Sequence, residues 1–364
     1  MMRARFRKSD GRYLILYGDR PLPPDLEIPQ PGPGVERLTE LRWHPFRAEW
    51  VAYAAHRQER TFLPPPDWDP LAPSVPGAHP TELPAGPWKV AVFENRFPAL
   101  HLGAAPPPAN VVETRPSLGA CEVVVYTPEW VDSLADLPTA HVEMLIDVWA
   151  ERTEELGAHE AIRYVMPFEN RGAEVGATLH HPHGQIYAYP FVPPVAAAGL
   201  EQQRAHMERR GTGLLESHLE AELRDGRRVI RRSGHALSFV PAFARYPYEA
   251  WVAPLEAVPS LARLTPEQRT AVALALQDLV RRYDAVRGTA FPYVMVVHQA
   301  PTDGAPHPEA HVRFEFYPQY RSPDRLKYLA GTEVGAGMFV NDTLPEQKAA
   351  ELRALAPLPA EVPS

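Results

Sequence analysis

Two histidines and a glutamine are spaced so that their side chains share one side of an extended segment. His181, His183 and Gln185 alternate with Pro182 and Gly184, and side chains two residues apart on a strand point the same way. A neutral imidazole can attack phosphorus and carry it as a phosphoramidate. The glutamine amide can donate to a phosphoryl oxygen but cannot act as a general acid. This stretch therefore indicates phosphoryl-group transfer through a histidine.

A loop spaced by glycines comes directly before this stretch. It spans residues 168–178 and contains Gly172 and Gly176, which let the backbone approach a phosphate closely with N–H groups free to point at it. A pair of histidines two apart is by itself more often a metal site or a structural cluster. The glycine loop and Gln185 together favour catalysis over those alternatives.

Short strands and two long helices are the elements that must position these residues. Apolar runs predict strands at 12–17, 49–55, 88–93, 123–126 and 164–166. Residues 138–157 show apolar side chains at helical spacing, and the same spacing returns from Val272 to Val286. Residues 195–226 also read as helical, amphipathic and charged.

The second half of the chain repeats the pattern of the first. Residues 133–137 return as 260–264, 164–166 as 293–295, and 189–190 as 317–318, at an offset that stays between 127 and 129. The repeat predicts an α+β fold of two half-domains, each with a helix packed on an antiparallel sheet. It pairs His183 with His311 and Gln185 with Arg313, so only the first half keeps the chemistry.

The run from Asn170 to Tyr187 resembles the active-site motif of the galactose-1-phosphate uridylyltransferases, the transferase branch of the histidine-triad superfamily. The resemblance covers roughly residues 41–345. It implies two histidine-triad-like halves, with Gln185 where the hydrolase branch has a third histidine. We expect an N-terminal arm (1–38), a first half with the active site (39–194), a helical connector (195–229), a second half (230–345) and a C-terminal tail (346–364).

The resemblance also assigns roles to individual residues. It implies that His183 is the nucleophile and that Gln185 stabilises the transferred phosphoryl group. Two arginines would contact the substrate phosphates, a strand end would contact the nucleoside, and a C-terminal segment would bind the sugar phosphate. The substrate-binding residues implied are Arg57, Arg60, Asn95, Phe97, Asn170, Gly172, Gly176, Thr178, Lys327 and Glu333. Without the resemblance, the arginines would read as surface charges, Phe97 as core, and 327–333 as a solvated helix start.

The resemblance implies two metal sites that this sequence does not match. Many relatives bind zinc through a Cys-x-x-Cys and two histidines. Here Asp69 and Ala72 stand at the cysteine positions and Trp130 at one histidine position, which leaves only His181. We predict that this structural zinc is lost, with Trp130 as a candidate apolar plug. At the second site His298 matches a ligand but Arg313 and Glu315 replace histidines, so we assign no metal there.

Composition narrows the class of protein further. The chain has 364 residues, a formal net charge of −8, and one cysteine, Cys121. The negative charge argues against nucleic-acid binding, and a single cysteine excludes an internal disulfide. The N-terminus lacks the apolar core of a signal peptide, and no run of about 18 apolar residues occurs. We therefore expect a cytoplasmic protein without a membrane span.

The function that the resemblance implies is exchange of UMP between UDP-glucose and galactose 1-phosphate. The resemblance implies a ping-pong mechanism through a uridylyl-histidine, and a homodimer with its sites at the subunit interface. One alternative is a nucleotide-sugar or dinucleotide phosphorylase, which uses inorganic phosphate as acceptor. Another is a non-catalytic nucleotide-binding scaffold, against which the intact run His181–Gln185 argues.

Overall fold

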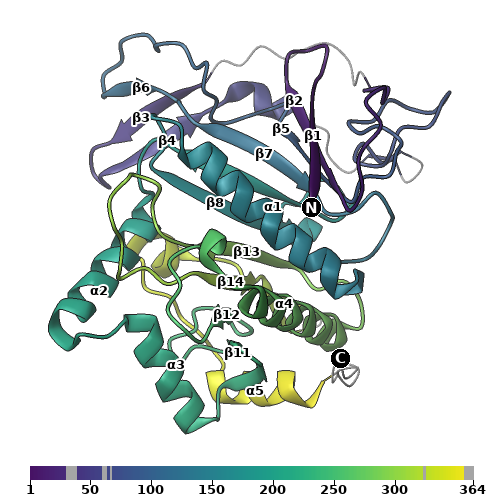
Figure 1. The fold of residues 1–364 in the computed structure, drawn as a ribbon. Coiled ribbons are helices and arrows are strands. Elements are labelled where there is room, and N and C mark those ends of the chain that lie inside the picture. The colour runs from purple at the N-terminus through teal and green to yellow at the C-terminus, as the bar shows by residue number, and fades with distance from the viewer. Residues whose placement is uncertain (30–38, 60–63, 66–67, 323–324, 356–364) are drawn as a thin grey trace.

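One large antiparallel sheet organises the molecule (Figure 1). The structure is a computed structural model that describes residues 1–29, 39–59, 64–65, 68–322 and 325–355. Within these ranges eleven strands form the sheet, in the order β1-β2-β5-β7-β9-β8-β13-β14-β12-β11-β10. The strands from β1 to β8 in this order belong to the first half of the chain, and those from β13 to β10 belong to the second.

The sheet strands are β1 (Met2–Arg7), β2 (Tyr13–Gly18), β5 (Val90–Glu94), β7 (Ala120–Val125), β8 (Tyr164–Arg171), β9 (His183–Tyr189), β10 (Val229–Ser233), β11 (Ala236–Phe239), β12 (Ala250–Pro254), β13 (Tyr293–His298) and β14 (Arg313–Pro318). Two smaller sheets lie beside it. They contain β3 (Glu40–His44), β4 (Glu49–Tyr53) and β6 (Thr114–Pro116), and β15 (Tyr320–Ser322) with β16 (Arg325–Leu326).

The α-helices are α1 (Thr139–Gly157), α2 (Pro194–Arg210), α3 (Leu214–Asp225), α4 (Pro266–Arg287) and α5 (Pro345–Ala354). Short helical turns are η1 (Ala55–Glu59), η2 (Leu134–Asp136), η3 (Ala173–Val175), η4 (Leu261–Arg263) and η5 (Thr332–Ala336). No helix in the described part of the chain is long and apolar enough to cross a lipid bilayer.

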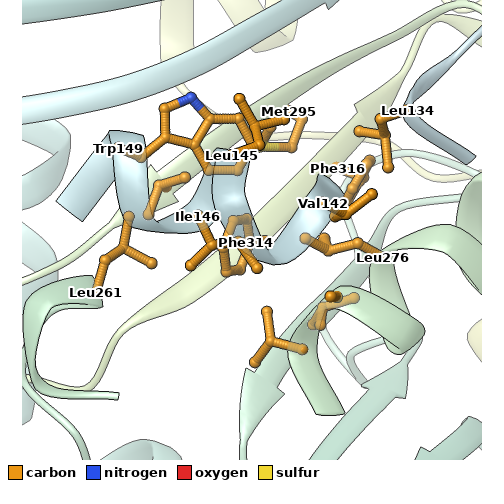
Figure 2. Close-up of a cluster of buried hydrophobic side chains, with 14 of the residues drawn as sticks. Leu134, Val142, Leu145, Ile146, Trp149, Leu261, Leu276, Met295, Phe314 and Phe316 are labelled. Atoms are coloured by element: carbon orange, nitrogen blue, oxygen red, sulfur yellow. The ribbon is translucent and has the colours of Figure 1, made fainter. Parts of the chain in front are cut away.

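The predicted α+β architecture of two similar halves is confirmed. Helices α1 and α4 lie side by side across one face of the sheet, one from each half (Figure 1). Their apolar faces meet the sheet in a single core, in which Ile146 and Trp149 of α1 pack near Leu276 of α4 and Phe314 of β14 (Figure 2). Burial of these side chains removes apolar surface from water, which is the main stabilising contribution of the fold.

The sequence repeat corresponds to equivalent elements in the two halves. Ser133 caps η2 before α1, and Ser260 occupies the same place before η4 and α4. The repeated strands β8 and β13 pair with each other, with Glu169 opposite Met295. The two halves therefore join through backbone hydrogen bonds at the centre of one continuous sheet.

Four segments differ from what the sequence led us to expect. The segment 168–171 continues β8, so the glycine loop begins only at Gly172. The helical stretch 195–226 is two helices, because Gly211 ends α2 in a left-handed conformation at φ 73°. The first strands β1 and β2 of the predicted N-terminal arm form one edge of the large sheet, and α5 places Ala349 and Leu352 in the core.

Candidate active site

Strand β9 carries the two residues predicted to do the chemistry. His183 and Gln185 are half-buried on one face of β9, whereas Gly184 and Ile186 point into the core on the other face. The neighbouring strands place Val123 of β7 and Phe168 of β8 opposite Gln185. Alternation along β9 thus brings the imidazole of His183 and the amide of Gln185 to the same side, as the spacing predicted, whereas His181 lies before β9 and is buried.

The ring of His183 is held in one orientation by its own backbone neighbour. Its Nδ1 donates to the carbonyl oxygen of His181 at 2.7 Å. A neutral imidazole that donates through Nδ1 keeps an unprotonated Nε2. Burial lowers the pKa of His183, although the hydrogen bond to His181 works in the opposite direction. The geometry therefore presents a neutral ring with its Nε2 lone pair available.

A cavity of about 360 Å³ opens beside this ring. Its walls come from separate segments of the first half and combine apolar side chains with polar and charged ones. Six of the predicted residues line it: His183, Gln185, Arg57, Asn95, Phe97 and Thr178. The cavity is also lined by Trp68, Pro70, Leu71, His79, Pro80, Thr81, Glu82, Phe93, Arg96, Val123 and Leu179.

Arg57 connects this cavity with a larger one. Its guanidinium donates to the carbonyl oxygen of Phe97 at 2.8 Å and to the hydroxyl of Tyr187 at 3.3 Å. Arg57 and Tyr187 also line an open cavity of about 1170 Å³ next to β3 and β4. A positive charge thus lies where the two cavities meet, in a position to contact a phosphate in either.

The segment predicted to contact the nucleoside, which contains Asn95 and Phe97, forms a local turn. The backbone N–H of Asn95 donates to Cys121 at 2.8 Å, and the side-chain oxygen of Asn95 accepts from the N–H of Phe97 at the same distance. This turn directly follows β5 and holds the ring of Phe97 in the wall of the cavity. The placement is compatible with the predicted contact to a nucleoside.

The glycine loop differs from its expected form. Gly172 and Gly176 have φ angles of 98° and 80°, which glycine adopts without strain. However, the N–H groups of Val175, Gly176 and Ala177 donate within the loop, to Gly172 and Ala173. The expectation that these amides are free to bind phosphate is therefore wrong, because the tight turn uses them itself.

Several predicted residues lie away from this cavity. Asn170, Gly172 and Gly176 are not among the described residues that line it. Lys327 and Glu333 are also not among them: both are buried in the second half, where the Lys327 ammonium donates to Glu333 at 3.0 Å and to the carbonyl of Val340 at 2.7 Å. Arg60 lies outside the described residues.

The residues at the first metal position do not fit zinc. Both ring nitrogens of His181 are occupied: Nδ1 lies 2.6 Å from Asp69 and Nε2 lies 2.7 Å from the carbonyl oxygen of Thr127. Ala72 has no ligand atom, and the ring of Trp130 packs edge-on against His181 at 6.1 Å while 63% exposed. Burial acts to raise the pKa of Asp69, but the hydrogen bond with His181 holds it below its usual value.

The second metal position contains an ion pair instead of a set of ligands. The Arg313 guanidinium donates to Glu315 at 2.6 Å, and His298 lies 3.8 Å from the same carboxylate. Burial lowers the pKa of His298 to about 4, although Glu315 partly opposes this. A permanently charged guanidinium cannot ligate a cation. Among the described residues no cluster of three or more His, Cys, Asp or Glu side chains is arranged to hold a metal.

Sequence reasoning did not identify part of the cavity wall. Trp68, His79 and Glu82 come from a segment without helical or strand periodicity, and the rings of Trp68 and His79 lie 5.8 Å apart. Glu82 is held by Lys8 and Arg12. Only the position of Trp68 directly before Asp69 could have indicated that this segment adjoins His181.

Comparison with known proteins identifies relatives over most of the chain. Residues 35–193 match the family described as galactose-1-phosphate uridyl transferase, N-terminal domain, and residues 199–361 match its C-terminal domain. Galactose-1-phosphate uridylyltransferase from Thermotoga maritima is 36% identical over 323 residues, covering 87% of this chain and 98% of that protein. The enzyme of the same name from Streptomyces lividans is 37% identical over 306 residues, covering 83% and 81%.

Solved structures show the same similarity. A structure described as a uridylyltransferase superposes with a TM-score of 0.77 at 33% identity, covering 86% of this chain and 97% of the other. An ADP-glucose phosphorylase from Arabidopsis thaliana with bound ADP-glucose gives a TM-score of 0.64 at 24% identity, covering 87% and 99%. At that identity the second likeness concerns the fold alone.

Proposed function

This chain belongs to the galactose-1-phosphate uridylyltransferase family, and from this membership we propose that it exchanges UMP between UDP-glucose and galactose 1-phosphate through a uridylyl-histidine. The observation that carries the proposal is the hydrogen bond from His183 Nδ1 to the carbonyl of His181 at 2.7 Å. It leaves Nε2 as the nucleophilic atom, at the edge of a cavity large enough for a nucleoside.

In the first half-reaction, Nε2 of His183 attacks the α-phosphorus of UDP-glucose. The bond from that phosphorus to the oxygen bridging the two phosphates breaks, and glucose 1-phosphate leaves with its electron pair. The imidazole gains positive charge as the N–P bond forms, and the carbonyl of His181 stabilises it through the Nδ1–H. Gln185, on the same face of β9, donates to a phosphoryl oxygen.

In the second half-reaction, a phosphate oxygen of galactose 1-phosphate attacks the same phosphorus. The N–P bond breaks, the imidazole recovers its lone pair, and UDP-galactose leaves. Both half-reactions exchange similar phosphate bonds and the leaving groups are already anionic, so positioning and charge stabilisation matter more than proton transfer. Arg57, between the two cavities, supplies a fixed positive charge for this.

The test is intact-protein mass spectrometry after UDP-glucose alone is added to the wild type and to His183→Gly. We expect the wild type, and not the variant, to gain the mass of one uridylyl group. Addition of galactose 1-phosphate removes the adduct and yields UDP-galactose, whereas a phosphorylase would require inorganic phosphate instead. A wild type that gains no mass contradicts the covalent mechanism.

We also propose that the protein is a homodimer whose active sites combine both subunits. Lys327 and Glu333 do not line the cavity beside His183 in their own chain, and apolar side chains next to them are exposed: Tyr328, Leu329, Val334 and Met338. The open cavity beside Arg57 offers room for such a segment. In this arrangement a partner chain would present its sugar-binding segment to the nucleotide cavity.

We propose, finally, that no structural zinc is bound at His181. The hydrogen bonds to Asp69 and to the carbonyl of Thr127 take the place of metal bonds. Metal analysis of protein purified from zinc-supplemented cells should give well below one zinc per chain. The triple variant Asp69→Cys, Ala72→Cys, Trp130→His completes four ligands with His181 and serves as the positive control. One tightly held zinc per wild-type chain contradicts this proposal.

A further inference from the structure

A buried carboxyl that the proposed mechanism does not use lies behind the catalytic strand. Glu169 on β8 is only 4% exposed, and each of its oxygens accepts a phenol hydroxyl at 3.2 Å, one from Tyr126 and one from Tyr293. Tyr126 directly follows β7, and Tyr293 begins β13. One carboxyl therefore connects three strands across the junction of the two halves.

Tyr126 is in direct contact with the segment that holds His183. Its backbone N–H donates to the carbonyl of Pro182 at 3.1 Å. Its hydroxyl lies against Gly184, since a Cβ at that position would be 2.5 Å from the phenol oxygen. Gly184 stands between the nucleophile and Gln185, so any displacement of the Tyr126 ring acts on the backbone of both.

The charge state of this carboxyl is set by a defined group of neighbours. Burial raises the pKa of Glu169 to about 7, against the lowering effects of the Arg171 guanidinium and the two phenols. Arg171 on the same strand pairs with Asp284 of α4 at 2.6 Å, and this aspartate weakly raises the pKa. From α1, the His141 imidazole donates to the carbonyl of Tyr126 at 2.7 Å.

Ionisation decides how many phenols the carboxyl can hold. A carboxylate accepts a hydrogen bond from each of the two phenol hydroxyls. A protonated carboxyl carries a hydrogen on one oxygen, and that oxygen must then act as a donor. Within the described residues neither phenol hydroxyl has a second acceptor. Protonation of Glu169 therefore reverses one of the two links and leaves the hydrogen of that phenol without an acceptor among the described residues, which weakens the hold between the strands.

Given the uridylyl transfer proposed above, we propose that Glu169 is a positioning residue: its carboxylate holds Tyr126 against Gly184, fixes the placement of His183 and Gln185, and releases that hold on protonation. It touches no substrate atom and acts through Tyr126. Through Tyr126, the transfer rate becomes sensitive to the protonation of Glu169, which is buried in the core at a distance from the reacting phosphorus.

The test is the pH dependence, between pH 5 and 9, of single-turnover uridylylation of His183. We expect the wild-type rate to fall as the pH drops through about 7, where Glu169 takes up its proton, and to fall again at lower pH as His183 is protonated. Glu169→Gln imitates the protonated form, because its amide must donate to one phenol. It should lower the rate at pH 8 by roughly 10- to 100-fold and abolish the step near pH 7.

Tyr293→Phe gives a second, milder readout. Loss of this donor destabilises the carboxylate, so the step near pH 7 should move to higher pH. Tyr283→Phe is the matched control, because this phenol is also fully buried but donates to the carbonyl of Tyr248 instead. It should leave the position of the step unchanged.

The results separate this inference from the proposed function. A wild type that forms no uridylyl-histidine refutes the mechanism itself. A second outcome is normal uridylylation in which the step near pH 7 is retained in Glu169→Gln or is unmoved in Tyr293→Phe. That outcome refutes only the positioning role of Glu169 and leaves it a structural residue. If Glu169→Gln does not fold, the comparison of Tyr293→Phe with Tyr283→Phe decides alone.

Discussion

At the scale of single residues, two side chains determine which reaction is possible. In the proposed mechanism His183 provides the nucleophile, and Gln185 provides a donor that cannot transfer a proton. This second property protects the intermediate, because a group able to activate water would hydrolyse it. The absence of a third histidine at position 185 thus favours transfer to another substrate over hydrolysis.

Replacing the glutamine should therefore alter the fate of the intermediate. In Gln185→His we expect UMP release from UDP-glucose alone to rise by about 100-fold, because an imidazole can act as general base toward water, while formation of UDP-galactose falls. The measurement is chromatographic quantification of both products. Gln185→Met, which cannot activate water, should lower exchange without raising UMP release; equal UMP release in both variants would contradict the argument.

The environment of His183 makes a prediction about pH. Burial lowers its pKa below the ordinary value of 6.5, and a lowered pKa keeps the ring neutral to lower pH. The loss of rate caused by protonation of His183 should accordingly lie below pH 6.5. NMR titration of the imidazole, with His183→Gly to assign its signal, measures this directly. A midpoint above 6.5 would show that burial does not dominate.

At the scale of elements, the N-terminal hairpin supports the cavity wall. Between β1 and β2, Lys8 and Arg12 are buried and both pair with Glu82, which lines the cavity. Arg12 also binds Asp10 at 2.6 Å. Buried charges are stable only when they are paired, so this cluster fastens the hairpin to the segment that forms the wall.

Removing one member of this cluster should cost much more than removing an exposed pair. We expect Arg12→Met to lower the free energy of unfolding by about 3–5 kcal/mol, because it leaves Asp10 and Glu82 short of a partner. Arg3→Ala on the same hairpin breaks exposed pairs with Glu151 and Glu155 and should cost less than about 1 kcal/mol. Urea unfolding measures both, and similar costs would argue against the structural role of the cluster.

At the scale of the whole molecule, two copies of one architecture have taken different tasks. The first half contains His183, the proposed nucleophile, and the cavity beside it. The second half has His311 and Arg313 at the repeat positions of His183 and Gln185; Arg313 is paired with Glu315, and the same half carries Lys327 and Glu333. The two halves are joined through β8 and β13.

The proposed site shared between two subunits predicts complementation. His183→Gly and Lys327→Ala should each be inactive alone, yet regain activity after joint unfolding and refolding. Recovery should approach roughly a quarter of the wild-type value, since half of randomly assorted dimers are mixed and each has one intact site. The double variant mixed with wild type is the control for dilution. No recovery, with dimers confirmed by light scattering, would place Lys327 in the site of its own chain.

Local sequence was sufficient for the chemistry and for the repeat. Alternation on a strand depends only on neighbouring residues, so the common face of His183 and Gln185 followed from their spacing. The helices over 139–157 and 266–287 likewise followed from apolar periodicity, and the repeated landmarks indicated two similar halves.

Only the tertiary structure decided which distant segments meet around that face. Strand order places β7 directly beside β9, with β5 and β2 beyond it, and no local period contains that order. Hence the sequence could not predict three contacts. They are the contribution of Glu82 to the cavity, the hydrogen bond of Asp69 with His181, and the hydrogen bonds of Glu169 with Tyr126 and Tyr293. The sequence by itself determined what can react, whereas the packing of strands far apart in the chain determined what holds and surrounds it.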